Sequence, residues 1–300
     1  MTTTTPPSVP AAVADVTTGA RPALGLARQV WSDRNGRAGL ILVTAMVLVA
    51  IAGAANLLPH SPLTQNPAHR LQGPSGSFWF GTDQFGRDVA ARTFAGVATS
   101  LRVAVSSVAA AAVIGSFFGI TAGLAGGWPD QVIGRVADVL FAFPAILLAL
   151  AVVSALGRGW QNTAIAIAIV YTPIFARVAR GPALSVAASE YVKAGRVLGI
   201  PAPRLLLRHV LPNVSAPIIV QVTLALSWAI LTESALSFLG LGTQPPDPSL
   251  GLMVSDARDI VAVDWWTMAF PALAIVLTVI GLNLLGDGLR SGLDPRGRRR

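Results

Sequence analysis

Long apolar runs alternate with short polar segments along most of the chain, and each run has the length of a membrane span. In a helix that rises 1.5 Å per residue, about 20 residues cross the roughly 30 Å hydrocarbon core of a bilayer. Six runs meet this length, at about residues 38–58, 103–126, 136–156, 163–179, 214–236 and 266–285. The pattern therefore predicts an all-α integral membrane protein with six transmembrane helices in contact with the lipid bilayer.

The composition agrees with a membrane protein and narrows the chemistry. Hydrophobic residues make up 53% of the chain and charged residues only 12%, whereas soluble proteins carry about 25% charged residues. The chain has no cysteine, which excludes a disulfide framework, thiolate metal sites and cysteine nucleophiles. His60, His69 and His209 are too scattered to indicate a metal site.

The distribution of the basic residues predicts the orientation of the chain. The net charge is +8, and Lys193 is the single lysine. With six spans, both tails and the second and fourth loops share one side, which carries sixteen basic residues against six on the other. The positive-inside rule makes that side, with both termini, cytoplasmic. The basic residues follow the membrane-proximal ends without interleaved aromatic residues, so we expect no nucleic-acid partner.

This orientation divides the chain into parts. Leu26, Val30 and Trp31 recur at helical spacing among charged residues, which fits a helix lying on the membrane surface and equally fits a polar lead-in to the first span. The predicted parts are a disordered cytoplasmic tail (1–25), an amphipathic surface helix (26–37), the first span (38–58), an extracytoplasmic loop with an interfacial helix (59–102), a core of five spans (103–288) containing a cytoplasmic loop (181–213), and a basic cytoplasmic tail (289–300).

Small residues recur at every fourth position of the second span, which places them on one face of a helix. That face allows two backbones to approach closely, so we expect this helix to pack against another one. The six positions are Ser107, Ala111, Gly115, Gly119, Gly123 and Gly127.

Two acidic residues lie within predicted spans. An ionised side chain in mid-bilayer costs about 2.5–3.5 kcal/mol, so Glu233, with Ser234 beside it, is a candidate contact of a translocation pathway or gate. A glutamate that bonds to hydroxyl neighbours near the outer interface explains it equally well. Asp138, near the start of the third predicted span, is a weaker pathway candidate, because an acid at a helix start also favours the dipole.

The most informative polar stretch is residues 189–213, which reads SEYVKAGRVLGIPAPRLLLRHVLPN. Residues 190–196 favour a short helix, and Gly199, Pro201 and Pro203 end it. A glycine followed by nine residues and a hydrophobic-x-Leu-Pro ending resembles the cytoplasmic coupling loop of ABC importer permeases; the alternative is an ordinary basic loop. The resemblance implies that an ATP-hydrolysing subunit docks here. Glu190, Tyr191, Ala194, Gly199, Leu211 and Pro212 fit the pattern, whereas Lys193, Gly195 and His209 depart from it.

Two further segments resemble the same family more specifically. Residues 80–89 read FGTDQFGRDV, a loop before a helix that Thr82 or Asp83 is expected to cap, and residues 233–242 read ESALSFLGLG. Together with the ending at 286–296 they are similar to C-type permeases of dipeptide, oligopeptide and nickel ABC importers. The resemblance implies the type I importer fold and a multi-pass protein of the bacterial cytoplasmic membrane. It makes Asp83, Arg87 and Asp88 candidate contacts of an extracytoplasmic binding protein.

As the resemblance implies, this chain forms the pathway with a second homologous permease, and two cytoplasmic ATPase subunits drive it. The chain itself lacks the Gly-Lys-Ser/Thr of a P-loop, so we expect no enzyme activity and no cofactor of its own, with ATP and Mg²⁺ on the partner subunits. Peptides are the expected cargo, and nickel or another small solute is the alternative. An ion-coupled secondary transporter using Glu233 is a second alternative, but neither inverted repeats nor several intramembrane acids are found. An intramembrane enzyme lacks a paired nucleophile and base.

Overall fold

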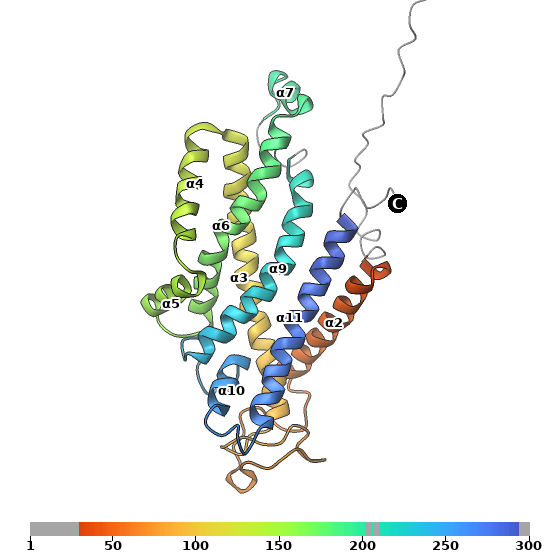
Figure 1. Cartoon of the computed structure of the whole chain (residues 1–300), viewed down its shortest axis with the longest axis vertical. Coiled ribbons are helices and arrows are strands. Elements are labelled where there is room, and N and C mark those ends of the chain that lie inside the picture. The colour runs from red at the N-terminus through yellow and green to blue at the C-terminus, as the bar shows by residue number, and fades with distance from the viewer. Residues whose placement is uncertain (1–29, 202–203, 205, 207–209, 294–300) are drawn as a thin grey trace, which may run out of the picture.

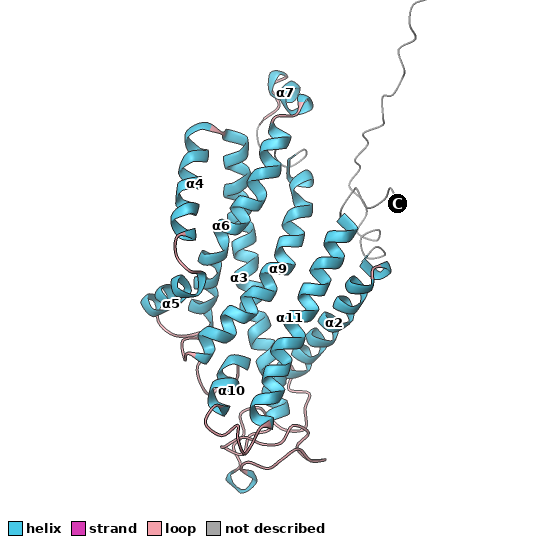
Figure 2. Ribbon diagram, in the orientation of Figure 1, coloured by secondary structure: helices cyan, strands magenta, loops and turns pink. Residues whose placement is uncertain are grey.

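The computed structural model describes residues 30–201, 204, 206 and 210–293. Throughout these residues the chain forms helices joined by loops, and Figure 2 shows no strand in the described part. The principal helices are α2 (Arg34–Ala54), α3 (Val89–Ala125), α4 (Gly127–Phe141), α5 (Ala145–Leu156), α6 (Trp160–Ala187), α7 (Glu190–Val197), α9 (Leu211–Phe238), α10 (Leu250–Ala257) and α11 (Trp266–Leu293), with a short 3-10 helix, η1 (Pro67–His69).

Five of these helices are each long and apolar enough to cross a membrane, namely α2, α3, α6, α9 and α11. A sixth span arises if α4 and α5 are counted together. The predicted all-α membrane architecture is therefore confirmed.

The third span is not the single helix that the apolar run at 136–156 predicts. Helix α4 ends at Phe141, and α5 begins at Ala145 at an angle of 92° to it. Pro144 precedes α5 as its N-cap residue, and a proline at that point cannot continue the hydrogen-bond ladder of α4. Asp138 consequently lies in the last turn of α4 rather than near the start of a span.

The second span also differs from the prediction at its beginning. Helix α3 starts at Val89 and continues for 37 residues without a break, so the expected interfacial helix before residue 103 is the first part of the same helix. Its N-cap is Asp88, whose Oδ1 accepts hydrogen bonds from the backbone N–H groups of Ala90 and Ala91, and neither Thr82 nor Asp83 has this role.

The predicted surface helix at 26–37 lies partly outside the described residues. Within its described part, Asp33 caps α2 by accepting a hydrogen bond from the N–H of Gly36 at 2.8 Å. Residues from Arg34 onward therefore belong to the first span.

The main core lies where α3, α6 and α9 meet, and it includes Val103, Ile167, Phe175, Ile230 and Leu236. Helices α2 and α11 form a second packed pair beside it, and Figure 1 shows both layers. In that pair a Cβ on Gly39 would overlap the backbone of α11 at Leu284 and Leu285, so a glycine is needed for the close approach.

The small-residue face of α3 lies against α6. Ser107, Ala111, Gly115, Gly119 and Gly123 are all buried. A Cβ on Gly119 would overlap the carbonyl group of Ala176, and one on Gly115 would overlap that of Thr172. Gly127 does not share this face, because it is the first residue of α4 and has open space around its α carbon.

The helices place two polar regions at opposite ends of the bundle. In Figure 1, α7 lies at the top, and the loop between α2 and α3 lies at the bottom beside α10. The first turn of α2 and the last turn of α11 point toward the α7 end. The described ends of the chain therefore share a side with α7.

Candidate functional site

The short helix α7 follows the long helix α6 after a two-residue break and projects beyond the spans (Figure 1). Val192 is completely buried and anchors α7 to the rest of the molecule. Tyr191 is about half exposed, and Ala194 is exposed while Gly195 is buried. Helix α7 thus presents one face to solvent and is held by the other.

The end of α7 carries an apolar surface that sequence reasoning missed. Val197 is 88% exposed and Leu198 is 80% exposed, although two large aliphatic side chains would ordinarily be buried. Their position just before the helix-ending Gly199 is the signal that could have identified them, because an apolar pair at the tip of a projecting helix has no core to enter.

Gly199 ends α7 in the way its residue type suggests. Its φ is +73°, a left-handed conformation that costs most residues about 1–2 kcal/mol and that glycine adopts freely. The N–H of Ile200 donates to the carbonyl of Gly195 at 3.0 Å, the long hydrogen bond of a Schellman motif. The chain therefore turns sharply after Leu198.

The remaining predicted residues of this region lie on both sides of a gap in the description. Lys193 donates to Glu190 Oε1 at 3.0 Å, and both side chains are exposed. Leu211 and Pro212 form the first turn of α9. His209 lies outside the described residues, as do 202, 203, 205, 207 and 208 of the segment that joins α7 to α9.

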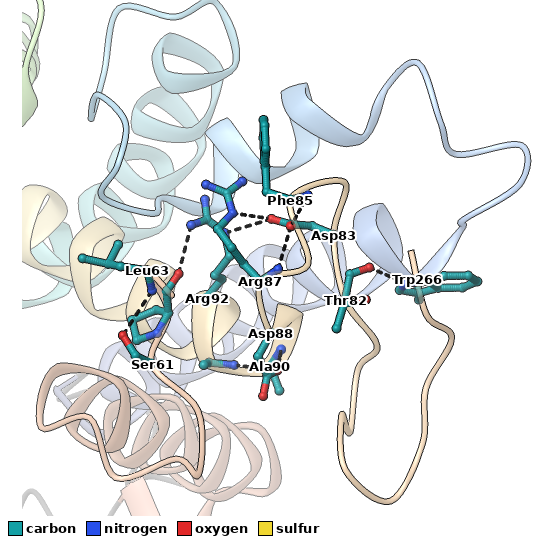
Figure 3. Close-up of polar contacts among 12 residues, drawn as sticks. Ser61, Leu63, Thr82, Asp83, Phe85, Arg87, Asp88, Ala90, Arg92 and Trp266 are labelled. Carbon is teal, nitrogen blue, oxygen red and sulfur yellow. Dashed lines mark hydrogen bonds and ion pairs between the residues drawn. The ribbon is translucent and has the colours of Figure 1, made fainter. Parts of the chain in front are cut away.

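At the opposite end, residues 80–89 form a closed loop around Asp83 (Figure 3). Asp83 Oδ1 accepts hydrogen bonds from the backbone N–H groups of Phe85 and Arg87, at 2.8 and 3.0 Å. Asp83 Oδ2 accepts from Arg87 Nε at 2.6 Å and lies 3.6 Å from Arg92 Nε. The indole N–H of Trp266 donates to the carbonyl of Thr82 at 3.1 Å, which ties the loop to α11.

Asp83, Arg87 and Arg92 form a charged group that we call the Asp83 cluster. Both of its arginines are buried. Arg92 is 2% exposed and also donates to the carbonyl of Pro62 at 3.1 Å. Asp256 of α10 faces them across a cavity of about 20 Å³, and burial raises the pKa of its carboxyl even though Arg92 and Arg87 oppose that change. The Asp83 cluster thus connects the loop to α3 and α10.

Asp88 is also engaged within the molecule. Besides capping α3, its Oδ2 lies 3.0 Å from His60 Nδ1. The side chains of Asp83, Arg87 and Asp88 therefore have partners inside the loop, and their predicted contact with a binding protein stays a prediction.

Glu233 and Ser234 lie inside the packing near the C-terminal end of α9. Glu233 is completely buried, and its Oε1 accepts a hydrogen bond from Ser237 at 2.7 Å. Its Oε2 faces the hydroxyls of Ser100 and Ser234 without a well-oriented hydrogen bond among the described residues. Glu233 reaches no surface in this structure, and its predicted pathway role stays a prediction.

Asp138 is placed differently, because it pairs with another helix. Arg177 of α6 donates to Asp138 Oδ1 at 3.0 Å, and its guanidinium lies 4.1 Å from the ring centre of Phe141. Arg180 forms a two-point ion pair with Asp130, with an NH2–Oδ2 distance of 2.6 Å. Two charge pairs therefore bridge α4 and α6, which the separate segments did not indicate.

A metal centre finds no support in the described residues, because no three of their histidine and acidic side chains are grouped to hold an ion.

Comparison with known proteins gives consistent matches along the chain. The family model for the inner membrane component of binding-protein-dependent transport systems matches residues 115–299. A dipeptide transport system permease protein of Alkalihalophilus pseudofirmus is 45% identical over 90% of this chain and 88% of its own length. A glutathione transport system permease protein of Pectobacterium atrosepticum is 42% identical over 84% of each chain. A di/tripeptide transport system permease protein of Pseudomonas aeruginosa is 39% identical over 89% of this chain and 90% of its own.

Proposed function

Because the chain belongs to the family of inner membrane components of binding-protein-dependent transport systems, we propose that it is the permease subunit of an ATP-driven importer of short peptides. It is a multi-pass protein of the bacterial cytoplasmic membrane. The peptide cargo rests on the names of relatives that transport dipeptides, di/tripeptides and glutathione. Its partners are a second permease, which completes the pathway, two ATPase subunits and an extracytoplasmic binding protein.

The observation that carries this proposal is the exposed surface of α7. A helix of eight residues that projects past the spans, with Val197 and Leu198 uncovered, has the character of a docking element, since large exposed apolar side chains mark interaction sites. Glu190, Tyr191, Lys193 and Ala194 are exposed on the same element and are the proposed contacts of the ATPase. Gly195 and Gly199 shape the helix, while Leu211 and Pro212 start the span that follows it.

The mechanism follows from two states that differ in the position of α7. An ATPase can change the permease only if its contacts with α7 differ between two arrangements of the spans. Helix α7 adjoins α6, and α6 packs on α3 through glycines at which the two backbones are in direct contact. A push on α7 is therefore transmitted to the α3–α6 pair as a unit. The chain itself supplies no ATP site and leaves hydrolysis, with its Mg²⁺, to the ATPase subunits.

Topology gives the first test. Ser189 to Asn213 must face the compartment that contains ATP, so single cysteines introduced there should react with a membrane-impermeant maleimide only after the membrane is opened. The natural chain has no cysteine, which removes background labelling of this subunit. Labelling of these positions in intact cells would refute the proposed coupling role.

Transport by the reconstituted complex gives the second test. In proteoliposomes with the ATPases and the loaded binding protein, dipeptide uptake should require ATP. The replacement of Glu190 and Tyr191 by alanine, or Gly199→Pro, should leave the chain in the membrane but remove both uptake and the stimulation of ATP turnover. Uptake driven by an ion gradient without any ATPase would instead support a secondary transporter.

A further inference from the structure

Helices α4 and α6 belong to candidate spans and face each other with charged side chains, although spans normally carry apolar ones. Asp138 lies eleven residues after the first residue of α4, which corresponds to about 16 Å along a helix axis. This distance is about half the thickness of a hydrocarbon core of about 30 Å. Its partner Arg177 lies near the end of the apolar run at 163–179, on the part of α6 that leads to α7.

This pair is not enclosed by the subunit. The side chain of Asp138 is 62% exposed and that of Arg177 is 61% exposed. Charged side chains within spans face a bundle interior or a water-filled cavity rather than lipid. The open side of the α4–α6 pair must therefore face water or another protein in the assembled transporter.

A groove of about 660 Å³ lies beside the pair, between α4 and α6. Small-molecule sites typically measure about 300–1,000 Å³, so the groove has the capacity for a short peptide. Gly134 forms part of its wall, and a side chain added there would meet no atom within 4 Å. Arg135 adds a further positive charge to the lining.

The second charge pair differs from the first and marks the end of the groove toward α7. Asp130 and Arg180 make a two-point contact, and only 17% of the Asp130 side chain is exposed. Asp138 and Arg177 make a single hydrogen bond, which leaves most donors of the guanidinium and one carboxylate oxygen available. The pair nearer α7 thus fixes α4 to α6, and the pair farther from α7 is open to a ligand.

We propose that Asp138 and Arg177 form a transit site for the two charged ends of a peptide, with Asp138 receiving the α-ammonium group and Arg177 the α-carboxylate. This inference rests on the proposed function as a peptide permease. A zwitterionic peptide can replace one protein ion pair with two pairs between protein and ligand, so no charge is left unpaired in the groove. Phe141 stacks on the guanidinium and keeps it at the break between α4 and α5.

Water access tests the placement of the groove without relying on transport. In the assembled, nucleotide-free complex, Gly134→Cys should react with a charged methanethiosulfonate reagent about as fast as an exposed thiol, because the position is open and lines the groove. Leu48→Cys is the matched control, since Leu48 is an exposed apolar residue in the middle of α2 and should face lipid. Equal, slow labelling of both positions would overturn the inference. Labelling of Gly134→Cys in the isolated subunit but not in the assembled complex would also overturn it, because the groove would then belong to an interface between permeases.

Transport then tests the role of the pair. Loss of a charge-assisted hydrogen bond to the peptide should lower the maximal uptake rate of a radiolabelled dipeptide by about 10-fold or more in Asp138→Asn and Arg177→Gln. Stimulation of ATP turnover by the loaded binding protein should persist, and Asp138→Glu should restore much of the uptake. Wild-type uptake in Asp138→Asn would overturn this inference alone, whereas a wild-type complex without ATP-driven peptide uptake would overturn the proposed function.

Discussion

Residues 80–89 and helix α7 are polar segments of similar length at opposite ends of the bundle, but their side chains point in opposite directions. In the outer loop, Asp83 and Arg87 are turned inward and satisfied by neighbours. On α7, Val197 and Leu198 point away from the molecule. The charged side chains of residues 80–89 pair with one another and stabilise their own loop. The exposed apolar side chains at the end of α7 are available to a partner.

The largest expected effect in this comparison is the loss of stability when the Asp83 cluster is disrupted. Asp83→Asn removes the carboxylate that faces Arg87 and Arg92, two buried guanidinium groups. Breaking a buried ion pair by removing one partner costs about 3–5 kcal/mol, so we expect a clear fall in the melting temperature of the purified chain.

The matched control for that change is Asp259→Asn at the same end. Asp259 pairs with Arg258, and both side chains are largely exposed, so the melting temperature should barely change. If Asp83→Asn melted like this control, the outer loop would not depend on its internal charges.

The second effect concerns α7 and should leave stability unchanged. Val197→Asp with Leu198→Asp places charges on an already exposed surface, but should weaken capture of the ATPase by about 2 kcal/mol or more if these residues are the centre of the contact. Binding is measured by titrating the ATPase onto the permease in nanodiscs. Val263→Asp, an exposed apolar position outside the helices at the other end, should have no such effect, and equal losses in both variants would remove α7 from the interface.

A smaller effect is expected from Gly199→Ala. Alanine at a φ of +73° costs about 1–2 kcal/mol, and α7 projects alone, so the strain should loosen only its last turn. Hydrogen exchange should increase within α7 while the exchange of α3 and α6 stays the same. An unchanged exchange pattern throughout would mean that α7 is ordered by something other than this turn.

The smallest effect is expected from Lys193→Glu. The exposed pair with Glu190 contributes only about 0.2–0.5 kcal/mol, so the melting temperature should hold. Lys193 departs from the pattern of the coupling loop that this segment resembles, and we expect it to meet an acid on its own ATPase. The variant should bind that ATPase more weakly than the wild type does, and this difference in affinity should be larger at low salt than at high salt. Undiminished assembly at every salt concentration would argue against such a partner.

Much of the architecture follows from local sequence. Apolar runs of span length predict the helices α2, α3, α6, α9 and α11, because the bilayer demands continuous helices of that length. The glycine and proline pattern after Val197 predicts where α7 ends, because a left-handed residue is a local requirement. The positions of Gly115, Gly119 and Gly123 likewise identify a close helix contact, although not that α6 provides it.

Other features required the assembled fold. Asp130 and Asp138 find Arg180 and Arg177 some 40 to 50 residues later, and no local pattern specifies which helix an isolated acid will face. The same limit explains Glu233, whose burial among serines of two helices decides that it does not line a surface. The bend of 92° between α4 and α5 depends on Pro144 together with the α3–α6 pair that they wrap.

By itself the sequence determined where five of the spans lie, where α7 begins and ends, and which family of transport proteins it joins, because span length, turn residues and motifs are local properties. Only the tertiary structure decided which charges are used up inside the molecule and which stay open. That difference depends on which residues from other parts of the chain surround each side chain. Asp83 is enclosed by its partners in the Asp83 cluster, whereas Asp138 lies beside an open groove.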